Sequence, residues 1–108
     1  MTEIADSIIH FETLFEQAEK VSIQTNKSLN DEQILDQLLD LISTIKQYYK
    51  AEFAPEIKSA LIKRSLGEIL FFISTISMRE NIDVYSALKD EIHLQEMDLL
   101  PDNKIITE

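Results

Sequence analysis

The stretch Ser65–Ile76, SLGEILFFISTI, decides how this sequence folds. It holds the only glycine of the chain and a single acid, Glu68, inside a dense run of apolar residues. At about 100° per residue, a helix through this stretch has one wide apolar face and further apolar residues opposite or beside it. The wide face consists of Leu66, Ile69, Leu70, Ile73 and Ile76, and the other side of Leu61, Phe71 and Phe72. A helix that is apolar nearly all round is buried on both sides.

The second buried side of this helix predicts an oligomer. In a chain of 108 residues, that side most naturally meets another subunit. We therefore expect a homo-oligomer, either a dimer or a tetramer, with Leu61, Phe71 and Phe72 in its interface. Gly67 has no side chain, so it allows another helix to pass close by.

The sequence around this stretch predicts three more helices. The four helical ranges are roughly 3–25, 31–53, 55–79 and 84–99. Asn30 and Gln33 form a capping-box pattern at the start of the second helix, and Pro55 suits the first turn of the third. The short connections favour an all-α, antiparallel four-helix bundle. We expect one domain over residues 1–100 and a polar tail over 101–108.

The composition narrows the kinds of partner. Twenty acids against ten bases give a formal net charge of −10, which repels the phosphates of DNA, RNA and anionic lipid. The chain has no cysteine, no basic N-terminal segment and no apolar run long enough to span a membrane. These features predict an acidic, cytoplasmic protein that binds neither a nucleic-acid polymer nor a membrane.

Carboxylates at helical spacing are the groups best suited to chemistry here. Neither histidine has a metal-ligand partner at the usual spacing, and one glycine cannot build a phosphate-binding loop. Asp36 and Asp40 lie four residues apart on one helix, and Glu68 lies on the next. Two facing helices that carry acids can hold a hard divalent cation such as Mg²⁺. The alternative is that these acids form the solvated faces of their helices.

The order of these pieces resembles the MazG-like nucleotide pyrophosphohydrolases. The similarity lies in ILDQLLDLISTI, a basic loop, and EIKSALIKRSLGEILFFISTISMRENIDVYSALKDEI, and covers roughly residues 32–91. This resemblance implies an all-α, oligomeric fold of the MazG-like type. It also implies Mg²⁺-dependent cleavage of nucleoside triphosphates to monophosphate and pyrophosphate.

The resemblance also implies a metal-binding set, which this chain has in altered form. The family pattern is E-x-x-E, a spacer and E-x-x-D. Gln37 and Asp40 occupy the first pair of positions, and Ser65 and Glu68 occupy the second. Two of the four carboxylates are therefore replaced by neutral groups, while Asp36 is a neighbouring acid. Gln and Ser offer a neutral oxygen but no charge, which weakens the attraction for a metal.

Two functions follow from this comparison. The first is a divergent nucleotide pyrophosphohydrolase with weakened or lost activity, in which Asp40 and Glu68 hold Mg²⁺ or Mn²⁺ with help from Gln37, Ser65 and Asp36. Its nucleotide phosphates would meet Lys63, Arg64 or Arg79, and no residue is assigned as catalytic. The alternative is a catalytically inactive helical oligomer that acts as a protein-interaction scaffold.

Overall fold

The protein is all-α, as the sequence predicts. The computed structural model describes the backbone of residues 2–99 and the side chains of residues 11–99, so the predicted polar tail lies outside the described residues. The helices are α1 (Thr2–Thr25), α2 (Asp31–Lys50), α3 (Pro55–Glu80) and α4 (Val84–Leu99). No strand occurs among the described residues. The four predicted helices are confirmed, and their ends agree to within about three residues.

The helix ends follow from local chemistry. Asn30 caps α2: its side chain accepts from the Gln33 backbone N–H, and the Gln33 side chain accepts in return from the Asn30 N–H. Helix α2 ends at Lys50, three residues before the predicted end. Residues Ala51 and Ala54 are extended, with ψ angles of 153° and 144°. Proline disfavours the helical conformation of the residue before it, and here the extended segment begins several residues earlier.

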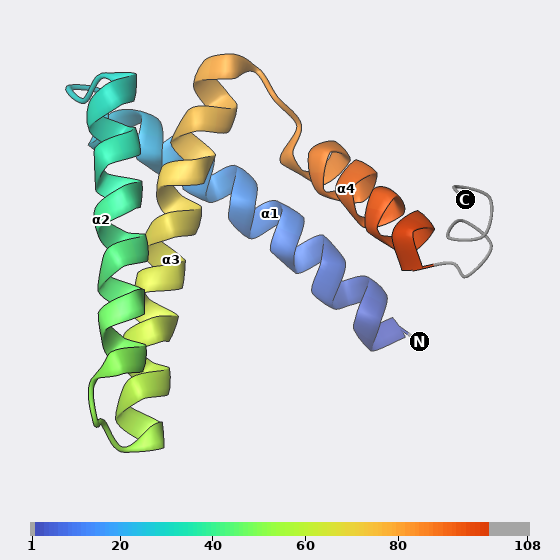
Figure 1. Cartoon of the computed structure of the whole chain (residues 1–108). Helices are drawn as coiled ribbons and strands as arrows, with labels where there is room; N and C mark the ends of the chain where they lie inside the picture. Colours follow the sequence, from blue (N-terminus) through green and yellow to red (C-terminus); the bar gives the residue numbers. More distant parts are fainter. Residues whose placement is uncertain (1, 100–108) are drawn as a thin grey trace, which may run out of the picture.

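Helix α3 lies at the centre of the arrangement (Figure 1). Helix α2 runs antiparallel along one side of it, and α1 crosses its other side. After the loop that follows α3, helix α4 runs away from the α2–α3 pair. The radius of gyration is 17.6 Å, whereas a compact domain of this length has about 13 Å. The chain is therefore open rather than globular.

Helices α2 and α3 pack through a narrow apolar seam. Ile34 is fully buried in it, and Ser65 is buried on α3. The seam also contains half-buried side chains on both helices: Leu38, Leu41, Ile45 and Tyr48 on α2, and Leu61, Ile62, Ile69, Phe72 and Ile76 on α3. Their spacing of three and four residues is that of a single helix face.

Helices α1 and α3 meet through small polar side chains. Ser74 donates to Ser22 at 3.1 Å, and the Asn26 amide donates to the Thr75 hydroxyl at 2.9 Å; all four residues are buried. Ser77 donates to a carboxylate oxygen of Glu19 at 2.9 Å. Small side chains let two helices approach closely, and the hydrogen bonds offset the cost of burying polar atoms.

This junction changes the interpretation of α3. The sequence predicted that Leu61, Phe71 and Phe72 on its second side meet another subunit. Within the chain, Phe71 lies beside α1, whereas Leu61 and Phe72 belong to the α2–α3 seam. Leu66 and Leu70, predicted to belong to the core face, are 50% and 43% exposed. The periodicity was correct, but several positions that make contact carry Ser and Thr, which an apolar count does not include.

Arg79, near the end of α3, binds the turn between α1 and α2, and we call this set of contacts the Arg79 clamp. The Arg79 guanidinium donates to the backbone carbonyls of Asn26 and Leu29 and forms an ion pair with Asp31 at 2.9 Å. The carbonyl contacts satisfy acceptors in the α1–α2 turn that have no partner within a helix. Arg79 therefore joins the end of α3 to that turn.

Asn81 ends α3 in the left-handed conformation, with φ 53° and ψ 47°. Asparagine tolerates this conformation better than most residues, and glycine tolerates it best. We expect Asn81→Ala to lower the free energy of unfolding by about 1 kcal/mol. Asn81→Gly should leave it nearly unchanged. Urea unfolding followed by circular dichroism measures both, and an equal loss in the two variants would contradict the conformational explanation.

Candidate functional site

The α2 members of the predicted metal set lie on the surface. Asp36, Gln37 and Asp40 are all exposed. The Asp40 backbone carbonyl accepts from the Thr44 hydroxyl at 2.8 Å, an ordinary contact within a helix. The structure therefore places these three residues on solvated parts of α2.

The two α3 members of the set lie in different environments. Ser65 is buried in the α2–α3 seam, with 4% of its surface exposed. The Glu68 side chain is half-exposed and lies 3.6 Å from the Arg64 guanidinium, one helical turn away. An exposed pair of this kind contributes little to stability. The acid that stands out in the sequence is therefore not enclosed by the apolar residues around it.

The described residues contain no group of three or more His, Cys, Asp or Glu side chains placed to hold a metal ion together. A Mg²⁺ site normally combines one or two carboxylates with waters and substrate phosphates. Asp40 and Glu68 remain the acids that the resemblance implies. The metal set stays a prediction, and no reaction step is derived from it.

The three predicted phosphate-binding residues also lie in different environments. Lys63 and Arg64 are exposed on α3, and Arg64 pairs with Glu68. Arg79 instead uses its guanidinium in the clamp on the α1–α2 turn. The phosphate role of these residues stays a prediction, and for Arg79 the structure shows a structural role.

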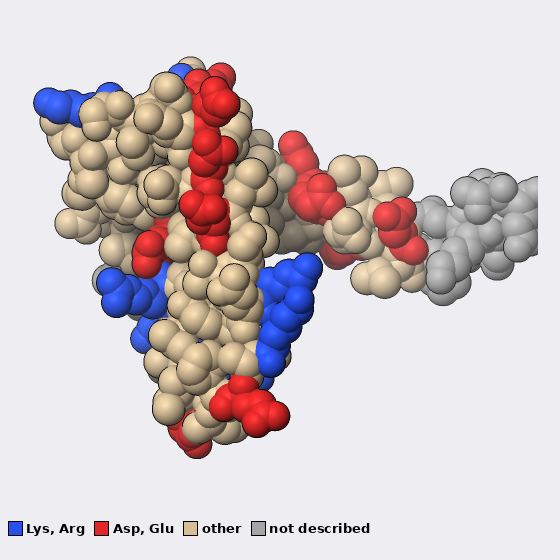
Figure 2. All heavy atoms as spheres, turned by 60° about the vertical axis from the view of Figure 1, so that its left-hand side comes forward, with Lys and Arg blue, Asp and Glu red and all other residues tan. Residues whose placement is uncertain are grey.

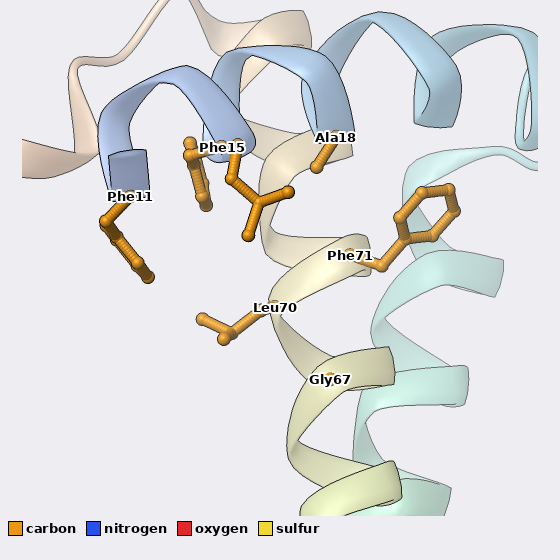
Figure 3. Close-up of a pocket in the computed structure, with 7 residues that line it drawn as sticks. Phe11, Phe15, Ala18, Gly67, Leu70 and Phe71 are labelled. Carbon is orange, nitrogen blue, oxygen red and sulfur yellow. The ribbon is translucent and has the colours of Figure 1, made fainter. Parts of the chain in front are cut away.

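An apolar groove lies between α1 and α3 (Figure 3). It has a volume of about 200 Å³ and is lined by Phe11, Leu14, Phe15, Ala18, Gly67, Leu70 and Phe71. Gly67 lines it, and apart from its own helix backbone and its chain neighbours no atom lies within 4 Å of where a β-carbon would stand. No other described helix therefore passes close to Gly67, contrary to the prediction from the sequence. Beyond Gly67 and Phe71 the surface continues to a second hollow, which Arg64, Glu68 and Phe72 line with Thr25 and Asn26.

The predicted oligomer-interface residues lie at or near this region. Leu61, Phe71 and Phe72 are half-buried within the chain. Phe71 lines both hollows, while Leu61 and Phe72 share the helix face of Ser65. Their role in an oligomer stays a prediction. Phe11, Leu14 and Leu70, which line the groove with Phe71, are exposed.

An acidic hollow lies on the other side of α1, next to the start of α4. Glu12, Glu16 and Glu19 line it from α1, and Asp83 and Tyr85 line it from the opposite wall. The Tyr85 ring packs edge-on against Phe11 and Phe15, with ring centroids 6.0 and 5.9 Å away. Its hydroxyl donates to the Phe11 backbone carbonyl at 3.2 Å. Tyr85 thereby attaches the first turn of α4 to α1.

The environment of Tyr85 predicts an alkaline sensitivity. Burial raises the pKa of its hydroxyl above 10.0, and the acids of the hollow raise it further. The folded chain holds this proton more tightly than the unfolded chain, so the stabilisation is complete below the ordinary tyrosine pKa. It is lost as the pH rises through the raised value. Ultraviolet absorbance should report the ionisation, and circular dichroism should report weakened folding over the same pH range.

Tyr85→Phe is the control for this prediction. It keeps the aromatic packing and removes both the ionisable group and the hydrogen bond to Phe11. The variant should lose the component of the alkaline transition that follows phenolate formation. An unchanged transition would assign the sensitivity to other groups.

The outward face of α2 carries an apolar stripe, which we call the α2 stripe. It consists of Leu35, Leu39, Ile42 and Tyr49, which are 52%, 62%, 55% and 65% exposed. This division was not predicted, because in the sequence the apolar residues of α2 form one continuous set. The stripe could have been recognised by its spacing, because its residues follow one another by four, three and seven positions, as along one face of a helix.

Comparison of the chain with known proteins identified no relative. No family model matches the chain, and no characterised protein or solved structure shows significant similarity to it. None of the described helices has the length and apolar character that crossing a membrane requires. The fold and the exposed surfaces therefore carry the functional argument.

Proposed function

We propose that this chain is a helical scaffold that assembles with copies of itself. One observation carries the proposal: among the described residues, Phe15 and Ile34 are the only large apolar side chains that are buried. Large apolar side chains on all four helices are exposed. Exposed apolar patches of this extent mark surfaces that another protein covers.

The exposed area supports the same proposal. The surface amounts to 8913 Å², whereas a compact monomer of this mass exposes about 6,200 Å². The difference is about 2,700 Å² for one chain, or about 5,400 Å² for two, which is at the upper end of the roughly 2,000–5,000 Å² that both partners of an obligate dimer bury together. Several exposed helix faces are the surfaces that an oligomer would cover.

The polar contacts explain how an open chain keeps its shape. No described, buried side-chain nitrogen or oxygen lacks a hydrogen-bond partner. The α1–α3 junction and the Arg79 clamp hold three helices in place without a large apolar core. The apolar surface is therefore free to face another molecule.

Sedimentation equilibrium over a range of micromolar concentrations tests the assembly. The chain mass is 12.5 kDa, and we expect a species of two or four times that mass. Its melting temperature should rise with protein concentration, because association stabilises the folded chain. A single species of monomer mass at all concentrations would contradict the proposal.

The second candidate is a MazG-like nucleotide pyrophosphohydrolase with weakened activity. The observation in its favour is that Glu68 and Arg64 share the rim of a hollow with two aromatic rings. An acid for a metal and a base for phosphates would then lie side by side. We expect little or no release of pyrophosphate from nucleoside triphosphates with Mg²⁺ or Mn²⁺.

Two substitutions decide between the candidates. If turnover is measured and both Asp40→Asn and Glu68→Gln abolish it, the chain is an enzyme. Lys89→Gln, on the distant helix α4, is the matched control and should keep any turnover. Absence of turnover, with no metal-dependent rise in melting temperature, leaves the scaffold function.

A further inference from the structure

We propose that two copies of this chain pair through α2, with the two helices antiparallel. The inference rests on the proposed oligomer and adds which surface forms it and in which orientation. Its basis is the α2 stripe together with the distribution of charge along the same helix. The second copy presents the identical surface, as a two-fold interface requires.

The α2 stripe has the spacing of a helix–helix seam. Leu35, Leu39, Ile42 and Tyr49 follow one another by four, three and seven residues, and Lys46 occupies the position between the last two. This is the a/d pattern of two helices that pack along each other. A lysine at one core position extends its aliphatic stem along the seam and sets the register.

The other face of α2 is already used. Ile34 is fully buried against α3, and Leu38, Leu41, Ile45 and Tyr48 are half-buried on the same side. The α2 stripe lies next to this face and points out of the chain. At one end of the stripe, the Lys58 ammonium of α3 lies 5.2 Å from the centre of the Tyr49 ring. A second copy therefore reaches Leu35, Leu39 and Ile42 without displacing α3, and only the Lys58 side chain has to make room at Tyr49.

Charge along α2 selects the antiparallel orientation. The first half of the helix carries Asp31, Glu32, Asp36 and Asp40, and the second half carries Lys46 and Lys50. Figure 2 shows acidic side chains in a column along the upper part of this face and basic side chains beside its lower part. A parallel pair would set acids against acids, whereas an antiparallel pair sets acids against bases.

The spacing identifies the residues that meet. Asp36 and Lys50 lie 14 residues apart, which is two heptads, so both flank the stripe on the same edge. Ser43 lies midway between them on that edge. A two-fold axis at Ser43 places Asp36 of each copy opposite Lys50 of the other. Ser43 then faces its own equivalent.

Cysteine cross-linking tests the geometry, because the natural chain has no cysteine. Ser43→Cys should form a disulfide-linked dimer under mild oxidation. In a mixture of Asp36→Cys and Lys50→Cys chains, the mixed disulfide should dominate over the two like pairs. Ser59→Cys, exposed on α3, is the matched control and should remain uncross-linked.

Charge reversal tests the orientation in solution. Asp36→Lys and Lys50→Asp should each weaken dimerisation by roughly tenfold, because two symmetry-related pairs become repulsive. The double variant Asp36→Lys/Lys50→Asp should restore it. Circular dichroism shows whether each variant keeps its helices.

The outcomes separate this inference from the proposed function. A monomeric chain overturns both. An oligomer in which the like disulfides dominate, or in which charge reversal has no effect, keeps the scaffold function and overturns the α2 pairing. Ile42→Glu provides a further check: it should abolish the dimer, whereas Ile57→Glu on α3 should keep it.

Discussion

Ile34→Ala is expected to lower the free energy of unfolding by about 2–5 kcal/mol. Ile34 is fully buried between α2 and α3, and it is one of the two buried large apolar residues of the described chain. Removing its side chain leaves a cavity in the seam that joins these helices. Few other apolar contacts are present to offset the loss, because most of the seam is only half-buried.

Ile57→Ala is the control for this change. Ile57 lies in the first turn of α3, much as Ile34 lies near the start of α2, but it is 52% exposed. Its replacement should change the free energy of unfolding by no more than about 0.5 kcal/mol. Urea unfolding at one fixed protein concentration measures both, since association also stabilises the chain. Equal effects would show that the seam at Ile34 is not a core.

Ser74→Leu is expected to separate α1 from α3 and to lower the free energy of unfolding by about 1–3 kcal/mol. Ser74 is fully buried, and its hydroxyl donates to Ser22 on α1 at 3.1 Å. Leucine is too large for this close contact and leaves Ser22 without that donor. The apolar character of leucine gives no compensation where there is no space for it.

Ser59→Leu is the matched control, because Ser59 is exposed on the same helix. It should leave stability nearly unchanged. Ser74→Ala separates size from hydrogen bonding: it fits the space and loses only the hydroxyl. If Ser74→Leu were as stable as the natural protein, the close approach of α1 and α3 at this position would be disproved.

The helices could be predicted because local signals define them. Asn30 and Gln33 form the expected capping box, and the extended residues before Pro55 separate α2 from α3. The contacts of α3 were harder to predict. Ser74 and Thr75 make its second interface through hydrogen bonds, and apolar periodicity does not detect such positions.

For the candidate site as well, the sequence predicted the helices that carry the residues but not the surroundings of their side chains. The sequence placed Asp40 and Glu68 on neighbouring helices, which is where they lie. It could not show that Asp40 is exposed, that Ser65 is buried, or that Glu68 pairs with Arg64. Rotation of a helix about its axis decides these points. That rotation depends on which of several apolar stripes finds a partner within the chain.

The α2 stripe is the clearest example. Apolar side chains recur along the whole of α2, but α3 covers only part of them: Ile34 and Leu38 are buried or half-buried, whereas Leu35 and Ile42 are exposed. The other part became visible as a separate surface once the partner of α2 was known. The residues that face α3 and the residues of the α2 stripe both recur every three or four positions, so periodicity alone does not distinguish the two faces.

The sequence by itself determined the four helices, their caps, the acidic charge and the surplus of apolar residues over what one small core needs. Each of these depends on residues close together in the chain or on composition. Only the tertiary structure decided that α3 lies between α1 and α2, that Arg79 clamps a turn, and that the α2 stripe remains exposed. These depend on contacts between residues far apart in the sequence, and such contacts are set by how whole helix faces fit together.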